Sequence, residues 1–140
     1  MAYRCKKTRG IHHVCLRVPD LKRAVRFYQE ALGAAFVCEW GPEGKDDHGI
    51  LLDLGEGDIL EIFGNRPDLA DGCWQHVAVY TQDIDASYRR ALACGAAPHQ
   101  EPRYSEIPTR AGELVKMGYA FVRSPGGELV EFIQDRMTGE

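Results

Sequence analysis

Two histidines and two glutamates carry the chemistry that this sequence offers. His13 and His76 each open a strand-like stretch, His-Val-Cys-Leu and His-Val-Ala-Val, while Glu61 and Glu131 lie in the apolar runs Ile-Leu-Glu-Ile-Phe and Leu-Val-Glu-Phe-Ile. Burying an unpaired carboxylate among such residues is costly. A divalent cation relieves that cost, and two imidazoles with two carboxylates suit zinc, nickel, cobalt or manganese. These residue types predict a metal site with positions left open in an octahedral shell.

The four residues occupy matching places in two copies of one pattern. The two histidine stretches are offset by 63 residues, and residues 57–63 (GDILEIF) align with residues 127–133 (GELVEFI) at an offset of 70. An isolated strand histidine or glutamate is more often an ordinary polar residue than a ligand. Recurrence of both types at equivalent positions of an internal duplication favours the metal site.

Each copy predicts a strand, a helix and three further strands. Stretches rich in β-branched residues at 10–18 and 73–81 predict the first strands. The later strands are expected near residues 34–41, 49–55, 58–63, 97–101, 115–123 and 128–134. Asn65 begins the linker between the copies, and residues 102–112, with two prolines, predict a long surface loop. The pattern indicates one domain, residues 1–140, of class α+β, with one βαβββ module at about 10–64 and another at about 73–135.

Helix signals recur in the same way. Asp20 is a credible N-cap for a helix that ends at Gly33, and Asp83 begins a second helix that stops at Gly95. Because side chains alternate across a strand, residues such as Leu16 are expected to pack under the helix. The two histidines and two glutamates face away from that packing. The remaining histidines are expected to be structural or exposed: His12, His48 and His99.

The composition of the chain limits the kinds of partner that it could bind. The formal charge is -4, and no basic cluster combines with aromatic residues, which argues against nucleic acid. No run of eighteen apolar residues predicts a membrane span. The five cysteines are widely spaced without a Cys-x-x-Cys pair, so no disulfide framework is expected. Cys15 and Cys94 are interpreted as small buried hydrophobic residues, and no cysteine is a candidate nucleophile. We expect a cytoplasmic protein with a small-molecule substrate.

A family resemblance follows from longer runs. His13-Val-Cys-Leu-Arg-Val-Pro-Asp-Leu, then Arg26-Phe-Tyr and Ala31-Leu-Gly, resembles the opening of vicinal oxygen chelate (VOC) proteins, the superfamily of glyoxalase I. Ser124-Pro-Gly-Gly before Glu131 resembles the penultimate turn of that family. The resemblance covers nearly the whole chain. It implies a cupped, incomplete mixed β-barrel around one divalent metal ion per site.

The second metal position discriminates within the superfamily. Glu61 gives the order His, Glu, His, Glu that is seen in glyoxalase I, the lactoylglutathione lyase. Extradiol dioxygenases and fosfomycin-modifying enzymes resemble a three-ligand His, His, Glu pattern, and methylmalonyl-CoA epimerases typically have glutamine at this position. The resemblance thus implies a metal-dependent lyase that converts the hemithioacetal of a 2-oxoaldehyde such as methylglyoxal into a 2-hydroxyacyl thioester. Proton transfer through a metal-stabilised enediolate is assigned to Glu131 as principal base, with Glu61 as its counterpart.

The same resemblance implies partners. Arg17 and Asn65 coincide with positions that contact glutathione in the resembled enzymes, although a surface salt bridge and a turn explain them equally well. A homodimer is implied, often with His13 and Glu61 of one chain completing the site with His76 and Glu131 of the other.

One loop departs from the family pattern. Bacterial glyoxalase I carries a lysine and two glycines where this chain has Glu113-Leu114-Val115. The candidates for the missing positive charge are Arg103, Arg110 and Lys116, and a substrate other than a glutathione adduct stays open. The alternatives are a thioester epimerase, another metal-dependent VOC enzyme, or a drug-binding resistance protein without catalysis.

Overall fold

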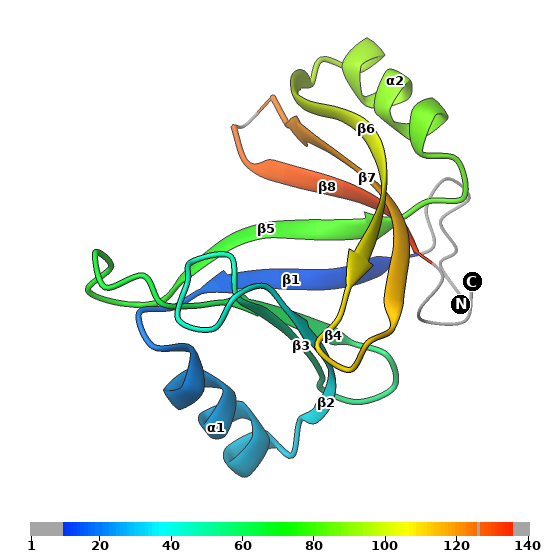
Figure 1. Cartoon of the computed structure of the whole chain (residues 1–140). Coiled ribbons are helices and arrows are strands. Elements are labelled where there is room, and N and C mark those ends of the chain that lie inside the picture. Colours follow the sequence, from blue (N-terminus) through cyan, green and yellow to red (C-terminus); the bar gives the residue numbers. More distant parts are fainter. Residues whose placement is uncertain (1–9, 126, 136–140) are drawn as a thin grey trace, which may run out of the picture. The chain divides into compact units, whose positions relative to one another are not determined.

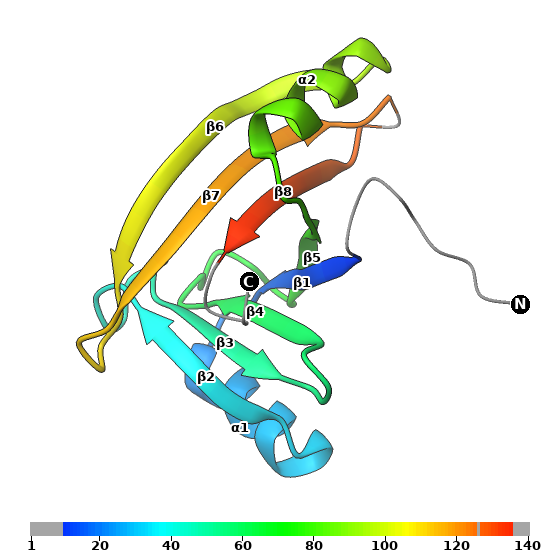
Figure 2. The ribbon, with the colours of Figure 1, turned by 90° about the vertical axis from the view of Figure 1, so that its right-hand side faces the viewer.

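A strand, a helix and three strands occur twice in succession along the chain (Figures 1 and 2). The computed structural model describes residues 10–125 and 127–135. The first set comprises β1 (Ile11–Arg17), α1 (Leu21–Leu32), β2 (Ala35–Trp40), β3 (Gly49–Asp53) and β4 (Ile59–Phe63). The second set comprises β5 (Cys73–Tyr80), α2 (Ile84–Ala93), β6 (Ala97–Pro108), β7 (Leu114–Arg123) and β8 (Leu129–Asp135). The predicted α+β class with two βαβββ modules is confirmed.

The chain divides into two compact units, which are described separately. Unit one contains His13–Gln75 and Ile107–Leu114. Unit two contains His76–Glu106, residues 10–12 and the described part of 115–135. The two units therefore contain most of the first and the second βαβββ set, respectively.

Local capping determines where both helices begin and end. The Asp20 carboxylate accepts a hydrogen bond from the Arg23 amide at 3.1 Å, and α1 ends at Gly33, whose φ is 70°. The Asp83 carboxylate accepts one from the Ala86 amide at 3.0 Å, so both predicted helix starts are confirmed. Neither helix in the described part of the chain is long and apolar enough to cross a membrane.

The C-terminal end of α2 corrects one expectation. Cys94 caps the helix and is exposed, so the interpretation of Cys94 as a buried hydrophobic residue is wrong. Its position just beyond the last helical turn explains the exposure, because residues at a helix end lie outside the packed apolar face.

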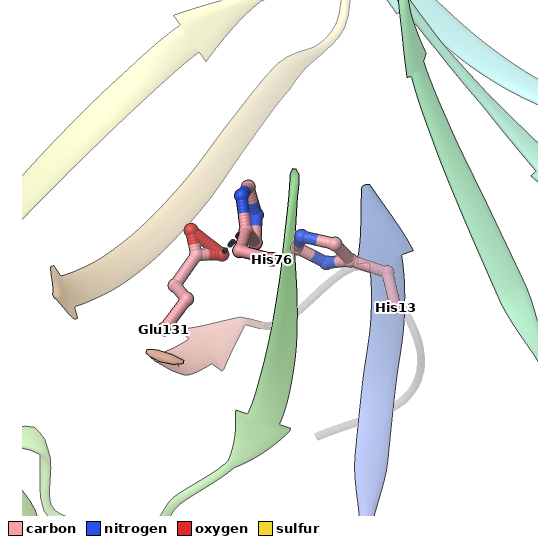
Figure 3. A group of neighbouring side chains, drawn as sticks. All are labelled: His13, His76 and Glu131. Atoms are coloured by element: carbon pink, nitrogen blue, oxygen red, sulfur yellow. Dashed lines mark ion pairs between the residues drawn. The ribbon is translucent and has the colours of Figure 1, made fainter. Parts of the chain in front are cut away.

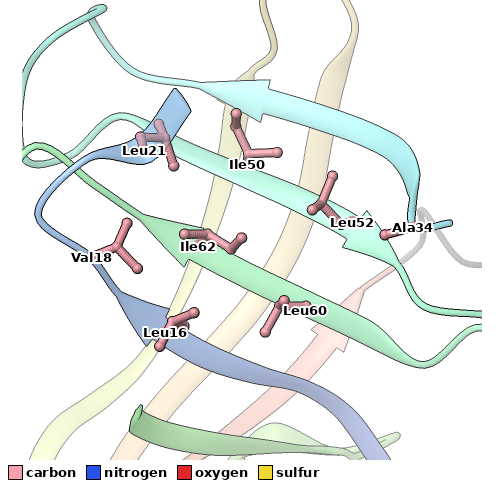
Figure 4. Close-up of a cluster of buried hydrophobic side chains, with 8 residues drawn as sticks. All are labelled: Leu16, Val18, Leu21, Ala34, Ile50, Leu52, Leu60 and Ile62. Atoms are coloured by element: carbon pink, nitrogen blue, oxygen red, sulfur yellow. The ribbon is translucent and has the colours of Figure 1, made fainter. Parts of the chain in front are cut away.

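In unit one, α1 covers one face of a four-stranded sheet. The strand order is β2-β3-β4-β1, with β1 parallel to β4 and the other pairs antiparallel. Eight buried side chains form the core between helix and sheet, as Figure 4 shows: Leu16, Val18, Leu21, Ala34, Ile50, Leu52, Leu60 and Ile62. Because Leu60 and Ile62 point to the helix, Glu61 between them points to the opposite face.

Unit two repeats this arrangement with α2. Its strand order is β5-β8-β7-β6, with β5 parallel to β8 and β7 antiparallel to β8. Ile84 and Tyr88 of α2 pack with Ala120 and Val122, and partly buried residues that include Val130 and Phe132 pack against this cluster. Glu131 lies between Val130 and Phe132, so strand alternation turns it to the sheet face without the helix.

A strand replaces most of the predicted surface loop. β6 continues through Pro108, so only residues 109–113 separate it from β7, and the prediction of a loop over 102–112 is wrong. β6 stands at the end of the strand order. An edge strand tolerates prolines because the missing N–H is not needed on the unpaired side.

Candidate metal centre

Unit one holds a buried pair formed by His13 and Glu61. The parallel ladder between β1 and β4 sets His13 opposite Ile59 and Cys15 opposite Glu61. His13 Nε2 lies 3.3 Å from Glu61 Oε1, and their side chains are 2% and 13% exposed. The pair therefore lies almost out of contact with bulk water, on the sheet face opposite α1.

Unit two holds the equivalent pair formed by His76 and Glu131. The ladder between β5 and β8 sets Ala78 opposite Glu131, which repeats the register of unit one. His76 Nε2 lies 3.9 Å from Glu131 Oε1, and the side chains are 5% and 8% exposed (Figure 3, dashed line). The ring of Phe121 meets the His76 ring edge-on, with the centroids 5.2 Å apart. The alternation of side chains along the sequence did not identify Phe121. Its strand, β7, contains no histidine or carboxylate that would mark one face as the site face.

Each pair fits a divalent cation. Two ligand atoms on one ion with bonds of about 2.1 Å are about 3 to 3.5 Å apart. The separations of 3.3 Å and 3.9 Å approach that range within each unit. Imidazole nitrogen and carboxylate oxygen are suitable donors for zinc, nickel, cobalt and manganese. Whether all four residues bind one ion stays a prediction.

Cys15 is a buried thiol beside Glu61 in unit one. The residue is 0% exposed, and its Sγ and a Glu61 carboxylate oxygen lie within 4.8 Å of each other. The thiol also donates a hydrogen bond to Gln75 Oε1 at 3.4 Å. Its burial is confirmed. Its place beside a candidate ligand was available from parity with His13, but the frequent role of cysteine as a small core residue masked that signal.

Arg17 and Asn65 both bind the segment between β2 and β3. Arg17 Nη1 donates to the Asp46 carbonyl at 3.2 Å, and its guanidinium lies 4.7 Å from the centre of the Phe63 ring. Asn65, with a left-handed φ of 60°, donates from Nδ2 to the Lys45 carbonyl at 3.1 Å. The two side chains therefore hold the same segment of unit one in place.

Two of the three side chains that could supply the missing positive charge already form ion pairs with acidic side chains. Arg110 Nη1 lies 3.6 Å from Glu39 Oε2 and 4.0 Å from Glu43 Oε2. Lys116 Nζ lies 3.5 Å from Glu106 Oε1. These pairs reduce the charge that either cation offers to a bound carboxylate.

Of the other histidines in the described strands and turns, His12 and His48 take buried structural positions and His99 is exposed. His48 is buried, with Nε2 2.9 Å from Glu39 Oε2. His12 is buried with its ring centroid 4.7 Å from that of Tyr80, and the His99 ring lies 6.2 Å from that of Phe121. These positions agree with the expectation that the three histidines are structural or exposed.

Cys38 is a second buried thiol in unit one, and its surroundings keep it protonated. Burial raises the pKa of Cys38 from 9.0 to about 11, and the negative charge of Glu61 adds to that effect. A thiol that retains its proton is a poor metal ligand and a poor nucleophile.

A duplicated βαβββ fold, with a histidine and a glutamate on the sheet face opposite the helix in each unit, defines a class of protein. A family model described as Glyoxalase/Bleomycin resistance protein/Dioxygenase superfamily matches residues 10–132. The chain belongs to this superfamily, as the sequence resemblance predicted.

Individual relatives support the narrower class. Lactoylglutathione lyase of Haemophilus influenzae is 30% identical, over 91% of this chain and 94% of the relative. That of Neisseria meningitidis is 31% identical, over 89% of each chain. The prediction of a glyoxalase-type enzyme is confirmed by these relatives. The solved structure of methylmalonyl-CoA epimerase from Mycobacterium tuberculosis has a TM-score of 0.67 at 21% identity, covering 95% of this chain and 92% of that chain, and this likeness shows the fold alone.

Proposed function

We propose that this protein is a metal-dependent lyase of the lactoylglutathione lyase kind, folded as a single VOC domain. Its substrate is the hemithioacetal of a 2-oxoaldehyde, such as methylglyoxal, and a thiol, with glutathione as the preferred thiol. One observation carries the proposal: a buried glutamate lies beside a histidine in each unit, at 3.3 Å and 3.9 Å. This duplication provides carboxylates for both metal binding and proton transfer.

The proposed site joins His13, Glu61, His76 and Glu131 around one ion of nickel, zinc, cobalt or manganese. Once bound, the ion supplies Lewis-acid stabilisation of negative charge on the substrate oxygens. Glu131 takes the proton from the carbon that bears sulfur and returns it to the neighbouring carbon. The hydroxyl proton of the first carbon moves to the oxygen of the neighbouring carbon, so the first carbon becomes the thioester carbonyl and the neighbouring carbon carries the product hydroxyl. The reaction moves protons without net oxidation. Glu61 faces the substrate as the counterpart of Glu131.

Burial explains how Glu131 serves as base. Its side chain is 8% exposed, so little bulk water competes for the carboxylate during transfer. The adjacent His76 ring, held edge-on by Phe121, restricts how the carboxylate turns. Proton transfer by a side chain positioned in this way contributes about 10²- to 10⁴-fold to a rate.

Arg17 and Asn65 are assigned to the thiol part of the substrate. Both side chains donate hydrogen bonds to the segment that follows β2, so they position its backbone as well as offering their own donors. A homodimer in which one chain supplies His13 and Glu61 and the other supplies His76 and Glu131 is part of the proposal. A cytoplasmic location stays a prediction.

Glutathione use is tested separately from the chemistry. Arg17→Ala and Asn65→Ala should raise the KM for the glutathione adduct far more than they lower kcat. Kinetics with the adducts of glutathione and of 2-mercaptoethanol measure this, because the smaller thiol lacks the carboxylates. An equal loss with both adducts would instead indicate damage to the segment between β2 and β3.

A thioester epimerase is the second candidate. Epimerisation needs a base on each side of an acidic carbon, and the buried glutamate of each unit could supply one. Glu61 argues for the lyase, because the resembled epimerases typically have glutamine there. The two functions differ in substrate, so direct assays with each separate them.

The experiment starts with protein purified without added metal and then loaded separately with nickel, zinc, cobalt or manganese. Methylglyoxal and glutathione are supplied, and thioester formation is followed by ultraviolet absorption. Parallel samples receive methylmalonyl-CoA. Lyase activity that depends on metal and is lost in His13→Ala and Glu131→Ala supports the proposal. Epimerase activity without lyase activity would establish the second candidate instead.

A further inference from the structure

A row of four residues crosses the sheet of unit one on the face that carries Glu61. The ladders pair Arg17 with Phe63, Phe63 with Gly49, and Gly49 with Trp40. Residues paired in this way share a sheet face, and Phe63 follows Glu61 by two residues, so the row lies about 6–7 Å along the strands from the glutamate. The row is therefore next to the candidate metal ligands of the same unit.

The aromatic rings of this row hold the Arg17 guanidinium on one side. The guanidinium lies 4.7 Å from the centre of the Phe63 ring, and the Phe63 and Trp40 rings meet edge-on with their centroids 5.7 Å apart. On another side, the Asp46 carbonyl accepts a hydrogen bond from Arg17 Nη1 at 3.2 Å. An aromatic face and a hydrogen bond together restrict the orientation of the guanidinium.

Gly49 provides the space in which the two rings meet. A Cβ atom on Gly49 would lie 2.7 Å from Cε2 and Cζ2 of Trp40 and 2.8 Å from Cε1 of Phe63. Carbon atoms in contact are normally about 3.5–4.0 Å apart, so a side chain at this position would displace at least one ring. Because Gly49 has no left-handed φ, the room for the rings is what the glycine contributes.

The matching row of unit two lacks this arrangement. Tyr80 is paired with Ile133 there, at the positions that Arg17 and Phe63 occupy in unit one. Ile133 is 2% exposed, so a buried aliphatic side chain is sufficient at this place in the sheet. Packing of the sheet therefore does not by itself require the cation and the aromatic ring of unit one.

We infer that the rings of Phe63 and Trp40 position Arg17 to bind a carboxylate of the thiol part of the substrate. The inference rests on the proposed function, which assigns Arg17 to that part. Nη1 is occupied by the Asp46 carbonyl and Nε is buried, so Nη2 is the nitrogen left to meet a ligand, and no described residue accepts a hydrogen bond from it. Hydrogen bonds between a guanidinium and a carboxylate are among the strongest in proteins.

Binding of S-methylglutathione tests the inference without catalysis, because this probe keeps both glutathione carboxylates and has no free thiol to bind a metal. Full-length protein is titrated by calorimetry as the wild type and as the variants. Phe63→Leu and Gly49→Ala should weaken binding by about three- to thirtyfold, whereas Phe63→Tyr keeps the ring and should keep the affinity. Phe27→Leu is the matched control, because Phe27 is 57% exposed on α1 and lies outside the row.

A double-mutant cycle with Arg17→Ala separates positioning from general support of the fold. If Phe63 acts through Arg17, Phe63→Leu should have no further effect on affinity in the Arg17→Ala background. Losses that add in the double variant, or equal affinities of the wild type and Phe63→Leu, overturn the positioning role alone. A wild type that does not bind the probe overturns this role together with glutathione as the proposed thiol. The lyase assay on the same wild type tests the proposed chemistry separately.

Discussion

The two histidine and glutamate pairs share one strand register but lie among different neighbours. In unit one the pair is flanked by Cys15 on β1 and, opposite Glu61, by Leu51 on β3. In unit two, Phe121 on β7 stands opposite Glu131 and touches the His76 ring. The comparison teaches that duplication kept the ligand positions while the surrounding side chains diverged. Unit one has a buried thiol beside its glutamate, and unit two has an aromatic ring beside its histidine.

Exchange of each carboxylate for its amide tests the assignment of Glu131 as principal base. Glu131→Gln should lower kcat by about 10²- to 10⁴-fold, because an amide cannot accept the proton. Glu61→Gln should lower kcat less, because Glu61 is assigned as the counterpart and not as the principal base. Steady-state kinetics with saturating metal measure both, and thermal unfolding checks that each variant is folded. If Glu61→Gln lost more activity than Glu131→Gln, the roles would have to be exchanged.

Truncation of the side chains opposite the two glutamates should separate stability from metal affinity. Leu51 is 5% exposed, so Leu51→Ala should cost about 2–5 kcal/mol of unfolding free energy. Phe121→Ala should in addition weaken metal binding by about 10- to 100-fold, because the His76 ring loses its neighbour. Denaturant unfolding without metal and titration with zinc measure the two effects. Equal zinc affinities in both variants would contradict a special role for Phe121.

Surface ion pairs in the two units should contribute little to stability. Arg110 is 36% exposed where it meets Glu39, while Lys116 and Glu106 are 62% and 58% exposed. Arg110→Ala should therefore destabilise unit one by about 1 kcal/mol or less, and Lys116→Ala should have a still smaller effect. Urea unfolding at low and high salt measures the difference. A large loss of stability in Lys116→Ala would show that the exposed fraction of an ion pair does not indicate how much the pair contributes to stability.

The buried thiol of Cys38 should have no effect on stability at neutral pH and a visible effect only at high pH. Because its folded pKa is raised from 9.0 to about 11, its contribution to stability is complete below pH 9 and is lost as the pH rises through about 11. Stability should therefore fall less steeply across this window in Cys38→Ala than in the wild type. Unfolding curves from pH 8 to 11 measure the slopes, with Cys94→Ala in unit two as control. Identical slopes in the wild type and Cys38→Ala would show that ionisation of the Cys38 thiol does not cause the loss of stability at high pH.

The sequence was sufficient for the elements whose signals are local. Asp20 and Asp83 cap their helices through neighbouring amides, so the chain itself encodes where those helices start. Strand alternation likewise predicted that Glu61 and Glu131 face away from the helices. The pairing between distant strands could not be predicted as well from the sequence. The prolines of β6 predicted a loop, because local composition does not show that a strand lies at the edge of a sheet, where prolines are tolerated.

Details of the site also depended on distant partners. The sequence marked His13 and His76 through their recurrence, but the edge-on contact of Phe121 required the pairing of β7 with β8. Arg17 and Asn65 were singled out as ligand contacts, and only the folded chain shows that both bind the segment between β2 and β3.

The number of metal ions bound per chain tests the central claim most directly. Mass spectrometric metal analysis of dialysed protein is compared for the wild type, His13→Ala and His76→Ala. If the pairs of both units share one ion, the wild type carries one ion per chain, and either substitution removes nearly all of it. Two ions per chain, with each variant losing only one, would contradict a shared site, and so would a wild type without metal.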